Sequence, residues 1–191
     1  MARVIVTEFV TLDGVFEDPG GSEELERGGW AFQFERGEEG DKFKLDETMD
    51  SEALLLGRRT FEGFAQHWPS REGEFADKFN NSTKYVVSST LTDPESVWSN
   101  SQVVSLNEVA RLRAGEGGDI VVHGSGQLAR ALLEQGLVDE LRLMVFPVVL
   151  GSGKRLFDET SAPRPLRLAE SRPVGPDGVV ILTYEPAGDD A

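Results

Sequence analysis

Cysteine is absent from this 191-residue chain, and basic residues are scarce, with 19 Lys and Arg against 34 Asp and Glu. The lack of cysteine excludes disulfides, thiolate nucleophiles and cysteine-ligated metal sites, and it fits a reducing cytoplasm. A formal net charge of -15 argues against nucleic acid and anionic membranes as partners, because those surfaces are bound by clustered basic residues. An anionic cofactor remains possible if the few basic residues gather where its phosphates lie.

Long hydrophobic runs are also missing, so the sequence predicts no membrane span. The N-terminal MARVIVTEFV lacks the small-residue cleavage site of a signal peptide, and we interpret it as a strand. Hydrophobic residues make up 39% and charged residues 28%, which is ordinary for a globular protein. We expect a single α/β domain over residues 1–186 and a flexible tail over 187–191.

The stretch from Asp119 to Phe146 contains a strand, a glycine turn, a helix and a second strand without interruption. Residues 120–122 form an apolar run typical of a strand covered on both faces. The run ends at Gly124-Ser125-Gly126, after which apolar residues follow a helical rhythm. Gly136 is placed to close this helix in the left-handed conformation.

The glycines therefore lie on a strand-to-helix turn, where the first helical amides have no internal partner and the helix dipole is positive. Gly124-x-Gly126-x-x-Ala129 meets the loose dinucleotide spacing G-x-G-x-x-G/A, which lets a phosphate approach the backbone. A tight strand-to-helix turn that binds no ligand would explain this motif equally well.

Two more turns of this kind follow predicted strands. Gly57-Arg58-Arg59-Thr60 follows the strand over 53–56, and paired arginines at a helix start oppose the dipole unless an anion compensates them. Ser88-Ser89-Thr90 follows the strand over 84–87 and can hydrogen-bond a phosphate or cap a turn. Solvated surface arginines are the alternative at the first turn. Because ligands bind at the carboxyl ends of strands in open α/β sheets, we expect the three turns to converge on one anionic ligand.

The segment over 15–40 is a long loop with Trp30, Phe32 and Phe34 at alternate positions. These aromatics either form one wall of an apolar pocket or pin the loop to the core. The sequence then predicts a helix over 39–49, with Phe43, Leu45 and Met49 partly inward. Near the C-terminus, strands over 166–171 and 178–185 should form an antiparallel hairpin about Pro176-Asp177-Gly178.

Four segments resemble the dihydrofolate reductase-like superfamily, with their order kept: TLDG (11–14), LLGRRTFEGF (55–64), YVVSSTL (85–91) and VVHGSGQLARALLEQGLVDELRLMVFPVVLGSGKRLF (121–157). The closest branch is the reductase domain of the riboflavin-biosynthesis deaminase-reductase proteins, which also occurs as a free-standing domain. The resemblance implies a three-layer α/β/α fold with a mostly parallel central sheet and a C-terminal antiparallel hairpin.

The resemblance also implies NADPH as hydride donor and a homodimer joined through the C-terminal sheet region. On this basis Gly57, Arg58, Arg59, Thr60, Ser88 and Ser89 would hold the adenosine side with its 2′-phosphate. The turn formed by Gly124, Ser125, Gly126, Gln127 and Leu128 would take the pyrophosphate.

On the substrate side, the resemblance places Asp13 and Gly14 near the nicotinamide, and the segment over 147–157 beside the substrate. Asp13 is the candidate proton relay or substrate anchor, and Trp30 and Phe32 are possible stacking walls. Folate reductases carry an anchoring carboxylate on the first helix. Asp41, Asp46 and Glu47 are available there, and we take Asp46 as the candidate.

The zinc deaminase pattern needs cysteine, so its absence excludes the bifunctional riboflavin enzyme. We interpret His123 as a satisfied core histidine. We expect an NADPH-dependent reductase of a small planar heterocycle or imine, pterin-like or pyrimidine-like. A Rossmann dehydrogenase built on the Gly124 turn is disfavoured, because Asp139 and Glu140 precede the next strand instead of ending it. A sensor domain that binds a nucleotide without turnover is the other alternative.

Overall fold

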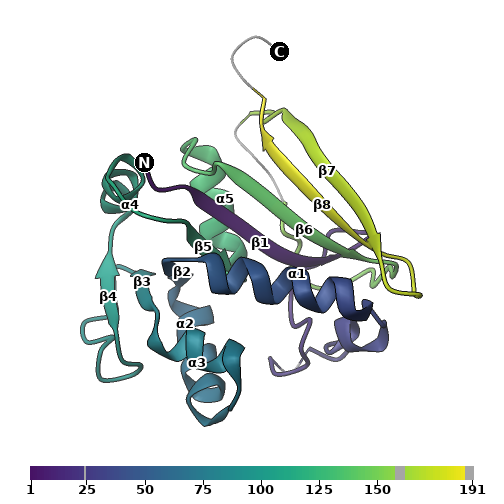
Figure 1. Cartoon of the computed structure of the whole chain (residues 1–191), viewed down its shortest axis with the longest axis horizontal. Helices are drawn as coiled ribbons and strands as arrows, with labels where there is room; N and C mark the ends of the chain where they lie inside the picture. The colour runs from purple at the N-terminus through teal and green to yellow at the C-terminus, as the bar shows by residue number, and fades with distance from the viewer. Residues whose placement is uncertain (24, 158–161, 188–191) are drawn as a thin grey trace.

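An eight-stranded sheet with helices on both faces forms the centre of the computed structural model, which describes residues 1–23, 25–157 and 162–187 (Figure 1). The strands are β1 (Val4–Thr11), β2 (Ala53–Gly57), β3 (Thr83–Val87), β4 (Ser101–Val104), β5 (Ile120–His123), β6 (Glu140–Phe146), β7 (Leu166–Val174) and β8 (Val179–Pro186). The helices are α1 (Gly37–Asp50), α2 (Arg58–His67), α3 (Glu74–Asn81), α4 (Leu106–Ala114) and α5 (Gly126–Glu134), with short 3-10 helices η1 (Trp30–Gln33) and η2 (Trp68–Ser70). The predicted tail falls outside the described residues from position 188 onward.

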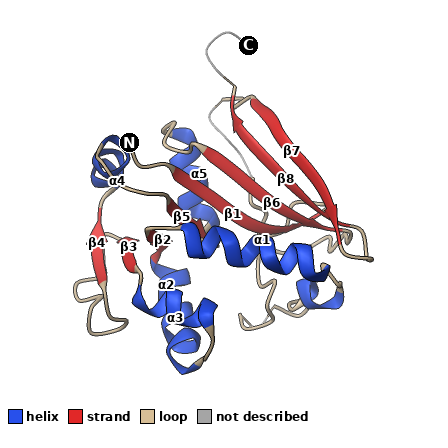
Figure 2. Ribbon diagram, viewed as in Figure 1, coloured by secondary structure: helices blue, strands red, loops and turns tan. Residues whose placement is uncertain are grey.

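The strand order is β4-β3-β2-β5-β1-β6-β8-β7, and β4 and β7 form the two edges of the sheet (Figure 2). Every pair from β4 to β6 is parallel, whereas β8 runs antiparallel to both β6 and β7. The predicted fold class, a mostly parallel sheet with a C-terminal antiparallel hairpin, is therefore confirmed.

Helices cover the two faces in separate groups. Val109 of α4 and Leu132 of α5 pack with Val122 and other strand residues in one apolar cluster. On the opposite face, Phe61 of α2 and Phe79 of α3 pack on β2 and β3, and Phe43 of α1 packs on a third cluster. The central strands β2 and β5 are buried on both faces, which explains their continuous apolar runs.

The helix α5 ends as its sequence predicts. Gly136 has φ +66°, a left-handed conformation that glycine adopts without steric cost. The Leu137 amide donates to the Leu132 carbonyl at 2.9 Å, and the Gly136 amide donates to the Leu133 carbonyl at 3.1 Å. These two bonds form a Schellman motif, which returns the chain directly into β6.

Two features differ from the sequence prediction. The strand β4 was not anticipated, because SQVV is short and partly polar. The helix α1 extends over Gly37–Asp50, but its buried side chains include the polar residues Lys44, Glu47 and Thr48, whereas Met49 is 37% exposed. Phe43 and Leu45 are partly buried as expected, but Met49 is not, and the periodicity missed the buried polar residues of the helix.

The strand β1 extends further than its neighbour β5. Residues 5–11 of β1 pair with β6, but pairing with β5 ends where Thr7 lies opposite His123. Residues 8–11 of β1 therefore extend beyond the end of β5, next to the turn that joins β5 to α5.

None of the described helices is long and apolar enough to cross a membrane.

Candidate functional site

The three predicted turns lie together at one edge of the sheet. Because β3, β2 and β5 are adjacent and parallel, their carboxyl ends emerge side by side. The Gly57 amide donates to the Ser125 hydroxyl at 2.9 Å, which joins the β2–α2 turn to the β5–α5 turn. Arg58 Nη1 donates to the Thr90 hydroxyl at 2.7 Å, which joins β2 to the turn after β3. The three turns are therefore adjacent, as the order of the parallel strands requires.

The start of α2 is basic and exposed. Its first turn has no acidic residue, and no side chain caps its first amides. Both Arg58 and Arg59 are exposed, and Arg58 also pairs with Glu62 at 2.7 Å. Glu62 pairs with Arg58, and the Glu23 carboxylate lies close enough to Arg59 to interact with it electrostatically. The two arginines nevertheless stand on a helix end that already carries partial positive charge, where an anion is favoured.

The start of α5 offers uncapped backbone amides. Ser125 adopts a left-handed conformation with φ 65°, and its hydroxyl does not cap α5. The hydroxyl instead accepts from Gly57 and donates to the His123 carbonyl at 3.3 Å. The first amides of the helix therefore have no side-chain cap. Gln127 is exposed, but the Leu128 side chain is buried in the core, so Leu128 can meet a ligand only through its backbone.

Glycine is required on this turn. A Cβ on Gly126 would overlap the ring of Phe16, which packs directly over the start of α5. At Gly124, φ is +58°, and a Cβ would lie 3.2 Å from the Thr60 methyl group. Thr60 therefore packs against the glycine turn from the start of α2.

The turn after β3 is organised by its own hydroxyls. The Ser88 hydroxyl accepts from the amides of Thr90 at 3.2 Å and Leu91 at 3.0 Å. Ser88 is therefore a turn cap here, the plainer of the two roles that the sequence left open. Ser89 and Thr90 are exposed beside Arg58.

Asp13 connects the loop after β1 to the loop after β6. Its carboxylate accepts from the Thr11 hydroxyl at 2.7 Å, the Gly151 amide at 2.8 Å and the Leu150 amide at 3.2 Å. The hydrogen bond from Thr11 and those from the two amides lower the pKa of Asp13 below its ordinary value. An ionised and fully engaged carboxylate is suited to holding the loops together and is a poor proton donor at neutral pH.

The two loops contact each other along their length. The Leu156 amide donates to the Gly14 carbonyl at 2.8 Å, and Val15 and Arg155 form an isolated antiparallel bridge. Lys154 pairs with Glu17. The segment that the resemblance assigned to the substrate side thus packs against the first loop.

The loop aromatics divide between the two predicted roles. Trp30 is buried, its indole N–H donates to the Glu17 carbonyl at 3.0 Å, and its ring meets Phe146 edge-on at 5.4 Å. Trp30 therefore pins the loop to the core. Phe32 is 77% exposed and, with Phe34, lines a cavity of about 410 Å³.

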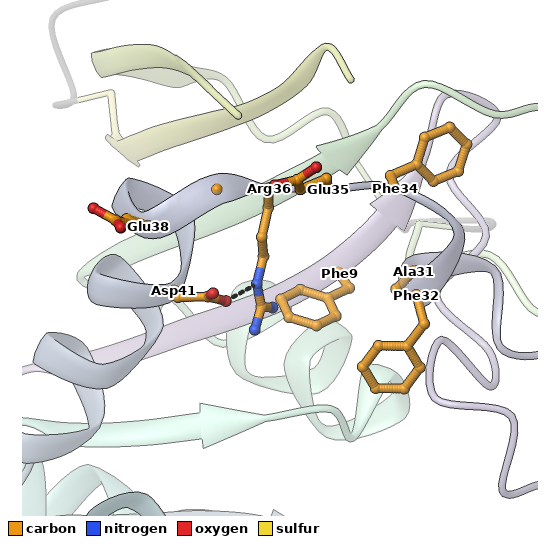
Figure 3. A pocket seen from close by; sticks show the side chains of 9 residues that line it. Phe9, Ala31, Phe32, Phe34, Glu35, Arg36, Glu38 and Asp41 are labelled. Carbon is orange, nitrogen blue, oxygen red and sulfur yellow. Dashed lines mark hydrogen bonds and ion pairs between the residues drawn. The ribbon is translucent and has the colours of Figure 1, made fainter. Parts of the chain in front are cut away.

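This cavity combines apolar and charged walls (Figure 3). Its lining consists of Phe9, Ala31, Phe32, Phe34, Glu35, Arg36, Gly37, Glu38 and Asp41. Arg36 Nε donates to Asp41 at 2.6 Å, and the guanidinium carbon lies 5.4 Å from the Phe9 ring centroid. Sequence reasoning missed Phe9 and Arg36, because a strand phenylalanine and a loop arginine carry no local motif.

The carboxylates of α1 point in different directions. Asp41 faces the aromatic cavity, whereas Asp46 is exposed and pairs with Lys42 at 2.5 Å. Asp46 lies instead on a second cavity, between α1 and the C-terminal strands. Glu47 is buried, accepts from the Thr7 hydroxyl at 3.0 Å, and pairs with Lys44. The structure thus places Asp46 away from the aromatic cavity.

Two buried titratable side chains lie within β1 and at the carboxyl end of β5. Glu8 has no described hydrogen-bond partner for Oε1, and burial raises its pKa to about 8. His123 packs on Phe79 with ring centroids 5.0 Å apart, and burial lowers its pKa. The expected core location of His123 is confirmed, but the expectation of a satisfied side chain is wrong, because Nε2 has no partner in the described structure. The sequence signal for Glu8 was a carboxylate inside an otherwise β-branched strand.

Within the described ranges, no group of three or more His, Asp or Glu side chains could hold a metal ion.

The chain is similar to several known proteins. The family model for the RibD C-terminal domain matches residues 2–180. The uncharacterized protein YyaP of Bacillus subtilis is 31% identical over 189 residues, covering 95% of this chain and 94% of YyaP. A second uncharacterized protein of that organism, YwjB, is 30% identical over 171 residues, covering 87% of this chain and 88% of YwjB.

Solved structures share the fold. A putative riboflavin biosynthesis protein from Shewanella sp. PV-4 has a TM-score of 0.77 at 23% identity, covering 98% of this chain and 99% of its own. A pyrimidine reductase-like protein from Corynebacterium diphtheriae has a TM-score of 0.67 at 15% identity, with coverages of 98% and 93%. Dihydrofolate reductase from Enterococcus faecalis, in complex with NADP(H), has a TM-score of 0.61 at 16% identity, with both coverages 96%.

Proposed function

The chain belongs to the RibD C-terminal domain family, and we propose that it is an NADPH-dependent reductase that transfers a hydride to a small planar substrate. The substrate would be a heterocycle or imine of pterin-like or pyrimidine-like chemistry. The observation that carries this proposal is the joining of three turns, far apart in sequence, into one basic and amide-rich edge.

The residues at this edge suit a phosphorylated dinucleotide. Arg58 and Arg59 are exposed, and Arg58 contacts the Thr90 hydroxyl, so the two arginines would hold the 2′-phosphate of the adenosine half. The amides at the start of α5 would hold the pyrophosphate. When bound, NADPH would supply the hydride, which no protein side chain can provide.

The aromatic cavity is the proposed substrate site. Phe32 and Phe34 offer ring faces to a planar heterocycle, and Arg36 and Asp41 offer a donor and an acceptor on the opposite wall. This polar pair would orient the substrate ring. The guanidinium would donate to ring nitrogens or carbonyl oxygens, and the carboxylate would accept from ring N–H groups.

Thermal shift measurements test the cofactor half of the proposal. NADPH should stabilise the protein more than NADH, and this preference should disappear in the Arg58→Ala, Arg59→Ala double variant. Arg111→Ala, which removes an exposed arginine on α4, is the matched control and should keep the preference. Equal shifts with NADPH and NADH in the wild type would contradict the proposal.

A non-catalytic sensor of the same fold is the rival, and turnover separates the two. The reductase should show a fall in NADPH absorbance when pterins, pyrimidines or quinones are screened as acceptors. A sensor would bind NADPH and leave the absorbance unchanged with every acceptor.

We also propose a cytoplasmic homodimer joined through the C-terminal sheet region. The strand β7 is a free edge of the sheet, most of its residues are exposed, and Leu168 is 48% exposed. Light scattering should give twice the monomer mass, and Leu168→Glu should weaken association. A monomer at every concentration would contradict this assembly.

A further inference from the structure

The charged groups of the aromatic cavity are mostly acidic. Glu35, Glu38 and Asp41 line it, and Arg36 is the one basic residue among the described residues of its lining. Three carboxylates and one guanidinium give the cavity a net charge of -2 at neutral pH. The whole chain has a net charge of -15, so the wider field of the protein has the same sign.

The single guanidinium of the cavity is held in place and is already paired. The stem of Arg36 packs against Gly40, where an added Cβ would lie 2.9 Å from the Cβ of Arg36. Its Nε donates to Asp41 at 2.6 Å, and the guanidinium lies over the ring of Phe9 (Figure 3). Asp41 therefore balances the positive charge of Arg36, and the other two carboxylates leave the cavity negative.

The start of α1 forms part of this lining, and it carries the opposite charge from the start of α2. The first turn of α1 contains Glu38 and Glu39. The first turn of α2 contains no acidic residue and begins with Arg58 and Arg59. Carboxylates near a helix N-terminus satisfy its partial positive charge. The dipole of α1 is therefore matched by its own residues, whereas that of α2 adds to the attraction for a phosphate.

The remaining walls of the cavity are aromatic. Phe32 is largely exposed, and Phe34 is partly exposed beside it. The face of an aromatic ring attracts a cation, as the position of Arg36 over Phe9 illustrates within the same cavity, with 5.4 Å between the guanidinium carbon and the ring centroid. Aromatic walls combined with net negative charge suit an organic cation, which proteins recognise by the same two features.

The charge and the rings of the cavity together define one class of substrate. We propose that the aromatic cavity takes a cationic ring, a protonated cyclic imine, and rejects rings that carry a phosphate or a carboxylate. The N–H of such a ring would donate to a carboxylate of the lining, and the volume of about 410 Å³ suits a small ring system. This inference rests on the proposed function, since the cavity is the proposed substrate site.

A protonated imine can be reduced without a proton donor in the protein. Hydride from NADPH would bring one hydrogen and two electrons to the imine carbon, where a new C–H bond forms, and would leave NADP⁺. The π electrons of the C=N bond would move to nitrogen, so the product is a neutral amine. The proton on nitrogen arrives with the substrate. This chemistry is consistent with Asp13, a poor proton donor whose carboxylate accepts three hydrogen bonds.

Titration calorimetry of the full chain tests the charge preference without NADPH. The probes share one ring: N-methylisoquinolinium is a permanent cation, isoquinoline is uncharged at neutral pH, and isoquinoline carboxylate is an anion. We expect affinity to fall in that order, with a difference of about tenfold or more between the cation and the anion. Added salt should reduce this difference, because it screens charges in an open cavity.

The double variant Glu35→Gln, Glu38→Gln tests the source of the preference. It removes two charges and leaves the pair of Arg36 and Asp41 intact, so the cation and the anion should bind with nearly equal affinity. Glu116→Gln removes an exposed carboxylate from the loop after α4 and should keep the wild-type order of affinities. Equal affinity of the wild type for the three rings, or tightest binding of the anion, would overturn the inference and leave the reductase proposal intact.

Turnover provides a second measurement, which separates the two proposals. The N-methyl dihydroisoquinolinium cation, added to the acceptor screen, should cause a fall in NADPH absorbance, because its reduction needs only a hydride. Turnover confined to uncharged or anionic acceptors would overturn the cationic substrate and would support the reductase. Absence of turnover with every acceptor would contradict the reductase proposal itself.

Discussion

Gly57 and Ser125, 68 positions apart in sequence, are joined by a hydrogen bond of 2.9 Å from the glycine amide to the serine hydroxyl. This bond fixes the arginine turn against the glycine turn, so the proposed phosphate sites keep a constant separation. The same hydroxyl would cap α5 in an ordinary helix, but here it leaves the first α5 amides uncapped.

Ser125→Ala should therefore weaken NADPH binding and lower the free energy of unfolding by about 1 kcal/mol, the usual effect of losing one hydrogen bond. Ser125→Gly is the matched variant, because it removes the same hydroxyl but suits the positive φ at this position. Both variants should lose NADPH affinity equally, and Ser125→Gly should lose less stability. Urea unfolding and nucleotide titration measure the two effects, and unchanged affinity in both variants would refute this role.

Trp30 and Phe32, two residues apart, should respond oppositely to truncation. Trp30→Ala removes a buried ring that contacts Phe146, and should cost about 3–5 kcal/mol of unfolding free energy. Phe32→Ala removes a largely exposed ring, and should change stability by no more than about 0.5 kcal/mol while weakening substrate binding. Denaturant unfolding of the two variants checks the assignment, and similar losses would argue against it.

Asp13→Asn should loosen the contact between the loops after β1 and β6. The neutral amide accepts hydrogen bonds from Gly151 and Leu150 less strongly than the carboxylate does, so hydrogen exchange at 148–156 should accelerate. Exchange in β5 and α5 should stay unchanged and serves as the internal control. If Asp13 is instead the proton relay, this variant should abolish turnover with no change in loop exchange.

The pH dependence of the free energy of unfolding should show that Glu8 is buried as a neutral carboxyl. Its folded-state pKa, about 8, lies above the ordinary 4.5, so the neutral group is compatible with the fold and the charged group is not. The contribution of Glu8 to the free energy of unfolding is therefore fully present below pH 4.5, and it is lost as pH rises to about 8. Glu8→Gln should gain stability over the wild type across this range, by at most about 1.4 kcal/mol per pH unit. A constant difference between the two proteins, measured by urea unfolding, would contradict the burial of a neutral Glu8.

Much of the fold followed from the sequence, because its signals are local. The apolar runs of β2 and β5, the glycine that ends α5 and the Pro-Asp-Gly hairpin each specify structure within a few residues. The convergence of the three turns also followed, since adjacent parallel strands end at the same edge.

The buried polar residues of α1 and the cavity beside this helix did not follow from the sequence. Lys44 and Glu47 are buried as an ion pair that also contacts the Thr7 hydroxyl, and periodicity cannot express this tertiary contact. Phe9 and Arg36 come together only when β1 and the start of α1 pack. The roles of Trp30 and Phe32 likewise depend on which ring reaches Phe146, and their alternate spacing could not decide this.

A crystal structure of the complex with NADPH tests the central claim most directly. The account predicts the 2′-phosphate beside Arg58 and Arg59 and the pyrophosphate at the first amides of α5. A nucleotide bound elsewhere, or no nucleotide at saturating concentration, would contradict the claim that these three turns form one cofactor site.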